Sequence, residues 1–396
     1  MRRQTTHVWV VPRGEYMLTL KTRGELVEGS PNELYEELYL TRRAIQYVID
    51  ALWELDKTPS LNQIHQMFYK TLRVQGFRAH QCKQIYKYAL STVKSAKNNG
   101  GKKPELKKLT ARLDKYDARV DLGSRIVVVK LRNKEFKIRL IHRRSYIEKF
   151  KGRKWYEVIV SIDKQGRIWI TIPFRWEYKP YKPKKLISLD INLGKIVVYD
   201  GRSIRRIDTR FTEALSPKIH AERIQKKYPR MWRYSKRILD RIKKLHRRSR
   251  NIAIDWSCKF AKYIVFKAKR TRNAIVLEDL EKLWFNVSKK SNAIADKLSR
   301  FAYRKLQLAI ITKAIEYNVP VIYVNPKGTS SMCPNCGARL VYNYRLAICK
   351  NCRFIADRDT IGAINIYLRA LRGMQGVLGY SLSAPPMNDE TRGRES

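Results

Sequence analysis

Hydrophobic and polar side chains alternate along residues 5–27 and again along residues 120–176. A period of two residues is typical of β-strands with one buried face. The later segment holds β-branched runs such as Ile126-Val127-Val128-Val129, and the turn sequence Asp163-Lys164-Gln165-Gly166 separates two such runs. Together the two segments predict a small antiparallel β-barrel, built from residues 1–30 and 119–182.

Apolar positions between these two segments recur every three or four residues, as they do on one face of a helix. Ser30-Pro31 supplies a helix start. Asn98-Asn99-Gly100-Gly101 interrupts the pattern, which resumes at Lys102-Lys103-Pro104 and continues toward Tyr116. The spacing predicts a helical module at residues 31–118 that interrupts the barrel.

The pattern changes again after the proline- and lysine-rich segment 179–183, where strands begin to alternate with helices. The runs 186–190 and 274–278 are apolar until their last residue, which is a carboxylate in each, and they predict two buried strands. An amphipathic helix at 298–310 and a strand at 321–324 follow. The second half is therefore expected to be an α/β layer, and the fold class mixed α/β and multidomain.

Charge narrows the range of partners. The chain carries 84 Lys+Arg against 35 Asp+Glu, a formal net charge of +49. Such an excess attracts polyanions, so the expected partner is nucleic acid rather than a small-molecule substrate. A membrane surface is the competing anion, but no apolar run approaches the roughly 18–20 residues of a spanning helix. The apolar stretch near the N-terminus is too short for a signal peptide, so we expect an intracellular protein without a membrane partner.

The densest basic segment runs from Lys218 to Arg250, with fourteen Lys/Arg and two acids. Ile238, Ile242 and Leu245 keep an apolar stripe within it, which predicts a packed helix with a cationic outer face. Such a face is often merely solvated. Here the density of like charge would make it self-repelling, so phosphate contact is favoured. The candidate nucleic-acid-binding residues are Arg241, Lys243, Lys244, Arg247 and Arg248.

Four cysteines form two matched pairs, Cys333/Cys336 and Cys349/Cys352, with twelve residues between the pairs. A redox pair or two disulfides would also use such spacing. Two Cys-x-x-Cys turns together favour one structural Zn²⁺ held by four thiolates, because soft sulfur ligands suit zinc.

Three acids stand where a second kind of metal site could form. Asp190 and Glu278 end the two buried strands, and Asp359 lies at the start of the last helix. Carboxylates that converge on a polyanion need bridging cations, and their oxygens suit Mg²⁺ or Mn²⁺. Singly, each has another explanation: Asp190 as a strand end, Glu278 as a surface residue, Asp359 as a helix N-cap.

Several segments together resemble the successive motifs of the TnpB family, transposon-encoded RNA-guided nucleases related to the type V CRISPR effectors. The resemblance covers residues 186–372 by motif. Its segments are Asp190-Ile191-Asn192, Ile275-Val276-Leu277-Glu278-Asp279-Leu280, Thr329-Ser330-Ser331-Met332-Cys333-Pro334-Asn335-Cys336-Gly337 and Asp357-Arg358-Asp359.

The resemblance implies a RuvC-like (RNase H-fold) nuclease domain at 183–327 and 357–372, with Asp190, Glu278 and Asp359 as its Mg²⁺- or Mn²⁺-binding catalytic triad. It further implies a zinc ribbon at 328–356, a wedge-like barrel at 1–30 and 119–182, and a helical recognition module at 31–118. Residues 373–396 would be a disordered tail. The implied partners are a guide RNA and double-stranded target DNA, in the cytoplasm of a prokaryote.

Two details qualify this assignment. The segment after Asp359 is Thr-Ile-Gly-Ala, where the family usually has an asparagine before the small pair. Asp357 lies close enough to remain an alternative third ligand. The presence of all three acids argues against a nuclease-dead relative.

Three functions are therefore compared. The first is an RNA-guided DNA endonuclease, which selects its target by base pairing beside a short flanking motif. The second is a zinc-ribbon nucleic-acid-binding protein, a repressor or RNA-processing factor, without nuclease activity. The third is a transposase that cuts without RNA. Metal-dependent cleavage separates the first from the second, and co-purifying RNA separates it from the third.

Overall fold

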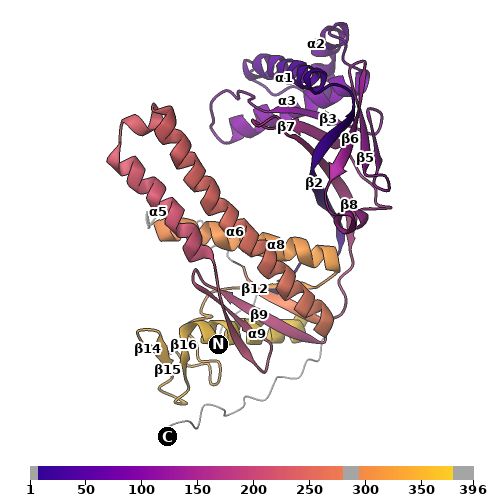
Figure 1. Cartoon of the computed structure of the whole chain (residues 1–396). Helices are drawn as coiled ribbons and strands as arrows, with labels where there is room; N and C mark the ends of the chain where they lie inside the picture. Colours follow the sequence, from indigo (N-terminus) through magenta and orange to yellow (C-terminus); the bar gives the residue numbers. More distant parts are fainter. Residues whose placement is uncertain (1–7, 280–293, 378–396) are drawn as a thin grey trace. The chain divides into compact units, whose positions relative to one another are not determined.

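The computed structural model describes residues 8–279 and 294–377. The chain divides into two compact units (Figure 1). We call residues 15–176 the insert unit, and residues 1–14 with 177–396 the core unit. No helix in the described part of the chain has both the length and the apolar character that a membrane crossing requires.

The insert unit contains a seven-stranded sheet in the order β3-β7-β8-β2-β6-β5-β4. Its strands alternate buried and more exposed residues, as the two-residue period predicts, and Figure 1 shows the long β2 curving along the sheet. The antiparallel, β-rich character expected from the sequence is confirmed. The strands are β2 (Gly14–Glu28), β3 (Leu109–Leu113), β4 (Ala118–Asp121), β5 (Ile126–Leu131), β6 (Lys134–Ile141), β7 (Val158–Ile162) and β8 (Ile168–Tyr178).

Three helices of the insert unit share one apolar core. They are α1 (Pro31–Trp53), α2 (Leu61–Val74) and α3 (Ala79–Asn98); a short α4 (Arg144–Glu148) follows β6. The helix start expected at Ser30-Pro31 is confirmed, since α1 begins at Pro31. The fourth helix, expected from residue 102 toward Tyr116, is wrong. Ala111 and Leu113 are buried alternately in β3, which pairs with β7, and Pro104 favours extended backbone before it.

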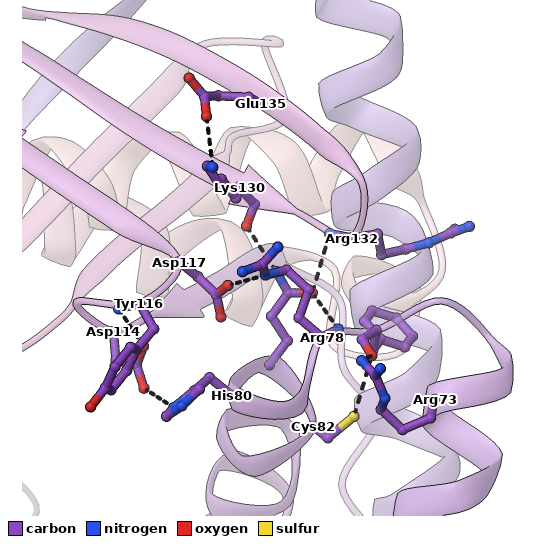
Figure 2. Close-up of polar contacts among 12 residues, drawn as sticks. Arg73, Arg78, His80, Cys82, Asp114, Tyr116, Asp117, Lys130, Arg132 and Glu135 are labelled. Carbon is purple, nitrogen blue, oxygen red and sulfur yellow. Dashed lines mark hydrogen bonds and ion pairs between the residues drawn. The ribbon is translucent and has the colours of Figure 1, made fainter.

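A polar cluster fixes the start of α3 to this sheet (Figure 2). Arg78 Nε lies 2.5 Å from Oδ1 of the buried Asp117. Gln81 donates to the carbonyl oxygen of Lys130 at 2.8 Å and accepts from the backbone N–H of Arg132 at 3.2 Å. His80 lies 3.0 Å from Asp114. The helical core is therefore attached to the strands by specific polar contacts as well as by apolar packing.

The core unit is organised around a six-stranded sheet in the order β1-β13-β12-β9-β10-β11. The β9-β10 and β10-β11 pairs are antiparallel, whereas β12 is parallel to both β9 and β13. The strands are β1 (Val8–Val10), β9 (Lys185–Ile191), β10 (Lys195–Tyr199), β11 (Ile204–Asp208), β12 (Asn273–Glu278) and β13 (Val321–Val324).

Helices cover both faces of this sheet (Figure 1). On one face α9 (Arg358–Val377) buries residues such as Leu186, Val276 and Ile322. On the other face, α6 (Lys236–Thr271) and α8 (Ile294–Tyr317) pack on each other, and α5 (Phe211–Lys227) packs on α6. A small sheet of β14 (Val341–Asn343), β15 (Leu346–Ile348) and β16 (Ile355–Asp357) precedes α9. The α/β layer expected for this half of the chain is confirmed.

Two further expectations need correction. The strand at Val8–Val10 was assigned to the barrel, but β1 pairs antiparallel with β13 of the core unit. Trp9 stacks on Tyr323 with ring centroids 4.2 Å apart, so aromatic packing holds this edge strand in place. The tail was expected to begin at residue 373, yet α9 continues to Val377. Residues 378–396 lie outside the described residues.

The first prediction concerns the cluster of Figure 2. Burial raises the pKa of Asp117, while the hydrogen bond and charge of Arg78 lower it. Arg78→Met leaves this carboxylate without its cation and should lower the free energy of unfolding by about 2 kcal/mol at pH 7, measured in urea.

Without Arg78 the folded-state pKa of Asp117 rises further above its unfolded value. The loss should therefore be largest at high pH and shrink as the pH falls, because the protonated carboxyl no longer needs a cation. Adding Asp117→Asn to Arg78→Met should recover most of the loss. This account would be contradicted if Arg78→Met lowered the free energy of unfolding equally at every pH, and equally in the presence of Asp117→Asn.

Candidate active site

Asp190 and Glu278 lie side by side at the carboxyl edge of the core sheet. Strands β9 and β12 are parallel, with Val276 opposite Ser188, and the same register brings Glu278 level with Asp190. Both side chains belong to the face that α9 covers, since alternate residues of a strand share a face. The expected placement of these two acids at one sheet edge is therefore what the fold produces.

The third acid comes from the first turn of α9. This helix begins at Arg358, and the backbone N–H of Asp359 donates to Oδ1 of Asp357 at 3.0 Å. Asp357 is thus the N-cap, the role that the sequence left open for Asp359. The charge of Asp359 acts on Asp190, and that of Asp357 is not among the charges that do so. Of the two candidate acids, Asp359 is therefore the one whose charge raises the pKa of Asp190.

Residues in the next turn of α9 explain how this helix can lie so close to Asp190 and strand β9. A Cβ atom on Gly362 would lie 2.9 Å from Oδ2 of Asp190, closer than side-chain carbons approach such an atom. The hydroxyl of the buried Ser188 donates to the carbonyl oxygen of Ala363 at 2.6 Å. The small pair Gly-Ala therefore leaves room for the Asp190 carboxylate beneath the helix.

Burial and mutual repulsion shift the titration of this cluster. Burial, then the charges of Glu278 and Asp359, raise the pKa of Asp190 to about 8. Burial also raises the pKa of Glu278. The pKa of Tyr303 on α8 is raised by burial and then by the charges of the same three acids. Each shift has the direction expected where anionic groups share a site of low dielectric.

Neutral side chains hold two of the carboxylates in position. Asn192 donates to Oδ2 of Asp190 at 3.0 Å, and Thr329 donates to Oε1 of Glu278 at 2.6 Å. The loop that carries Thr329 is fixed to α9 in turn, since the side chain of Asn365 donates to the carbonyl oxygen of Thr329 at 2.7 Å. Glu278 is therefore oriented, through Thr329 and Asn365, by the same helix that contributes Asp359.

A cation from the small sheet also contacts the cluster. Arg345, between β14 and β15, pairs with Asp359 and lies 3.6 Å from Asp357. The sequence analysis did not identify Arg345, Tyr303, Thr329 or Asn365 as parts of this site. Thr329 and Asn192 both lie within the motifs quoted above. The position of Asn192 two residues after Asp190 was an available signal, whereas no acid adjoins Thr329 in the sequence. Arg345 and Tyr303 carried no such signal.

The four cysteines form a compact cluster next to these acids. Their sulfur atoms all lie within 4.8 Å of one another, with Sγ–Sγ distances of 3.5 Å between Cys333 and Cys352 and 3.4 Å between Cys336 and Cys349. A disulfide would bring two sulfurs to about 2.05 Å, whereas a tetrahedral zinc with bonds of about 2.3 Å separates its sulfurs by about 3.8 Å. The donor set and its spacing fit one Zn²⁺.

The two cysteine turns are built alike. The N–H of Cys333 donates to the carbonyl of Ala338 at 2.8 Å, and the N–H of Cys349 donates to that of Phe354 at 2.9 Å. Gly337 and Arg353, one position after the second cysteine of each turn, both have positive φ, at 75° and 57°. Backbone hydrogen bonding from Ala338 lowers the pKa of Cys336 to about 6, which favours a thiolate.

Ile361 of α9 packs into the apolar cluster around Cys333 and Cys349. The zinc ribbon thus supports the helical turn that carries Asp359. Among the described residues, the cysteines are the group whose ligand atoms lie close enough together to hold one ion; the three acids do not form such a closed set.

The basic segment 218–250, expected to form one helix, is divided: its first part ends α5, residues 228–235 form a turn, and its remaining residues begin α6. The apolar stripe that was expected in this segment lies on α6. Ile242 is buried, and the five candidate residues Arg241, Lys243, Lys244, Arg247 and Arg248 lie at positions that are not buried. Among these five residues, an ion pair is found within the described part of the chain for Lys243, whose Nζ lies 4.0 Å from Oδ1 of Asp240. A packed helix with a cationic outer face is confirmed; its contact with phosphate stays a prediction.

Comparisons with known proteins agree with this geometry. A model of the Cas12f1-like TNB domain matches residues 303–366, which include all four cysteines and Asp359. The chain is 31% identical over 265 residues to the TnpB-like protein MJ0751 of Methanocaldococcus jannaschii, covering 63% of this chain and 91% of that protein. It is 30% identical over 163 residues to the CRISPR-associated endodeoxyribonuclease Cas12f2 of a Micrarchaeota archaeon, covering 36% and 29%.

The fold is shared more widely than the sequence. The Cas12f1 chain of a complex with sgRNA and target DNA superimposes with a TM-score of 0.55 at 14% identity, covering 85% of this chain and 81% of that one. The class is therefore that of multidomain, mixed α/β proteins with a Cas12f-like fold. Within that class the chain belongs to the TnpB-like family, which is related to the type V CRISPR effectors.

The second prediction concerns the zinc ribbon. The purified protein should contain about one zinc per chain, because four thiolates complete the coordination of one ion. Cys349→Ser should lose that zinc and raise amide hydrogen exchange in the first turn of α9, through Ile361. Cys258→Ser, at an exposed cysteine of α6, is the matched control and should keep both zinc and protection. A zinc-free wild type with a fully protected α9 would refute the assignment.

Proposed function

We propose that this protein is an RNA-guided DNA endonuclease of the TnpB type. It would hydrolyse DNA with divalent metal ions at a target selected by pairing with a bound guide RNA, next to a short flanking motif. The observation that carries this proposal is the pairing of Asp190 and Glu278 at one sheet edge, where the charge of Asp359 on α9 also acts on Asp190. The four-cysteine cluster, which packs against α9, supports it.

The core unit supports a RuvC-like assignment for the nuclease. Three antiparallel strands, β9 to β11, continue into parallel β12 and β13, and the acids stand at the carboxyl ends of β9 and β12. In open α/β sheets this edge is where sites are built. We assign the seven-stranded sheet of the insert unit to the wedge role and the module of α1, α2 and α3 to recognition.

The donor set at this edge suits Mg²⁺ or Mn²⁺, since it consists of carboxylate oxygens. A bound cation would stabilise the charged form of Asp190, which burial and then the charges of Glu278 and Asp359 disfavour. When bound, a pair of such ions supplies an activated water and stabilises the leaving oxygen of the phosphodiester. Asp190, Glu278 and Asp359 would hold them, while Asn192 and Thr329 keep two of the carboxylates oriented.

The expected partners are a guide RNA and double-stranded DNA. One relative is a CRISPR-associated endodeoxyribonuclease, and the Cas12f1 structure is a complex with sgRNA and target DNA. The cations on the outer face of α6 and the net charge of +49 supply the sequence-independent attraction that such partners need.

The third prediction tests the chemistry. Asp190→Ala, Glu278→Ala and Asp359→Ala should each lower the rate of plasmid cleavage by about a thousandfold or more, because several kcal/mol of transition-state stabilisation are lost. Binding of RNA and target should remain close to wild type, since affinity comes from basic surfaces and base pairing. Activity should require Mg²⁺ or Mn²⁺ and disappear with EDTA, and Ca²⁺ should support binding better than cleavage.

Asp357→Ala is the matched control, because this acid caps α9 and should affect stability by about 1 kcal/mol rather than abolish cleavage. If Asp357→Ala is inactive and Asp359→Ala cuts normally, the third ligand is misassigned. If all four variants cut like wild type, the protein is not this nuclease. Cleavage by a preparation free of RNA would favour a transposase instead.

The fourth prediction tests the basic face of α6. Replacing Arg241, Lys243, Lys244, Arg247 and Arg248 by Gln should flatten the slope of log affinity against log salt, by up to about 0.9 for each phosphate that is no longer neutralised. Gln keeps a high helix propensity, so an unchanged melting temperature serves as the control for folding. An unchanged slope would mean that this face is merely solvated.

A further inference from the structure

The turn that joins α5 to α6, residues 228–235, is an exposed aromatic segment of the core unit outside the site. We propose that this hairpin turn is a stacking site for unpaired bases of a nucleic acid. The inference rests on the nucleic-acid binding in the proposed function and adds to it a place and a mode of contact that cleavage chemistry does not require.

The hairpin turn has a defined backbone. Helices α5 and α6 pack on each other, and the turn lies where the two meet, at the end away from the core sheet (Figure 1). Trp232 N–H donates to the carbonyl of Tyr228 at 3.1 Å, and the N–H groups of Tyr234 and Ser235 donate to that of Met231 at 3.0 and 2.9 Å. Its side chains are therefore presented by an ordered turn, so little backbone entropy is lost on binding.

Aromatic surface is left open at this turn. Tyr234 is 88% exposed and Met231 is 61% exposed. Trp232 has Arg233 over its ring at 5.0 Å, and Tyr228 has Lys227 over its ring at 5.6 Å. Within the described residues, the ring of Tyr234 stacks on no other aromatic ring. Its ring is thus available to stack on an incoming planar group.

The charge around the turn selects an anionic partner. Residues 223–239 contain seven Lys/Arg and no Asp or Glu. They are Arg223, Lys226, Lys227, Arg230, Arg233, Lys236 and Arg237. A protein surface docking here would have to neutralise all of them, whereas a nucleic-acid strand offers one phosphate per nucleotide together with a base.

The combination of the open Tyr234 ring and the surrounding cations favours unpaired nucleotides over duplex. In a duplex the faces of the bases are stacked on one another, and only phosphates and groove edges are accessible. Single-stranded segments expose their bases, which stack on Tyr and Trp side chains with little sequence preference. The partner class is therefore a single-stranded stretch of DNA or RNA, such as a displaced or looped-out segment.

Binding in EDTA separates this inference from catalysis. Full-length protein, stripped of RNA in high salt, is titrated into a fluorescent dT oligonucleotide and into a blunt duplex of equal charge. Tyr234→Leu should weaken binding to the single strand by about 5- to 100-fold, because base–aromatic stacking is lost. Its salt slope should not change, since no cation is removed. Tyr234→Phe, which keeps the ring, should bind like wild type.

Tyr263→Leu, at a 43% exposed tyrosine on α6, is the matched control and should bind like wild type. Equal affinity of Tyr234→Leu and wild type for the single strand would overturn the inference. So would equal losses on single strand and duplex, or binding to phosphatidylserine vesicles that depends on Tyr234. Failure of the wild type to bind either oligonucleotide would overturn the nucleic-acid partner itself, and with it the proposed function.

Discussion

The close approach of α9 to strand β9 is the constraint on which the arrangement of the acids depends. One carbon atom added at Gly362 would reach the carboxylate of Asp190. At this separation the hydroxyl of Ser188 can bond to the α9 backbone, and Asp359, one turn earlier, can act on Asp190. The helix also positions Glu278 indirectly, through Asn365 and Thr329. A wider gap would move Asp359 away from Asp190 and Glu278, whose own proximity is set by the pairing of β9 with β12.

The zinc ribbon also helps to hold α9 in place, because its apolar centre packs against this helix. Its apolar centre includes Ile361, and Arg345 extends from its hairpin to the acids at the start of α9. The four-cysteine cluster and the carboxylate cluster are therefore mechanically connected over a single helical turn. This connection gives a physical reason for placing the four cysteines immediately before the third acid in the chain.

The positions of Asp190 and Glu278 could be predicted because each ends an apolar run, and parallel strands bring such ends together. The choice between Asp357 and Asp359 could not, since it depends on the residue at which α9 begins; a shift of one residue turns a side chain by about 100°. The sequence also misplaced β1 and the segment before Tyr116. A three-residue strand carries no information about which sheet edge it joins, and Pro104 was taken for a helix start.

The pairing of β1 with β13 has a consequence for synthesis of the protein. Val8 lies opposite Val324, so the core sheet cannot be completed until almost the whole chain has left the ribosome. The insert unit, residues 15–176, has its helical core and its strands within one continuous stretch and can fold much earlier. During this interval the first strand remains unpaired next to an already folded unit. The order of translation thus delays formation of the acid cluster until the rest of the molecule exists.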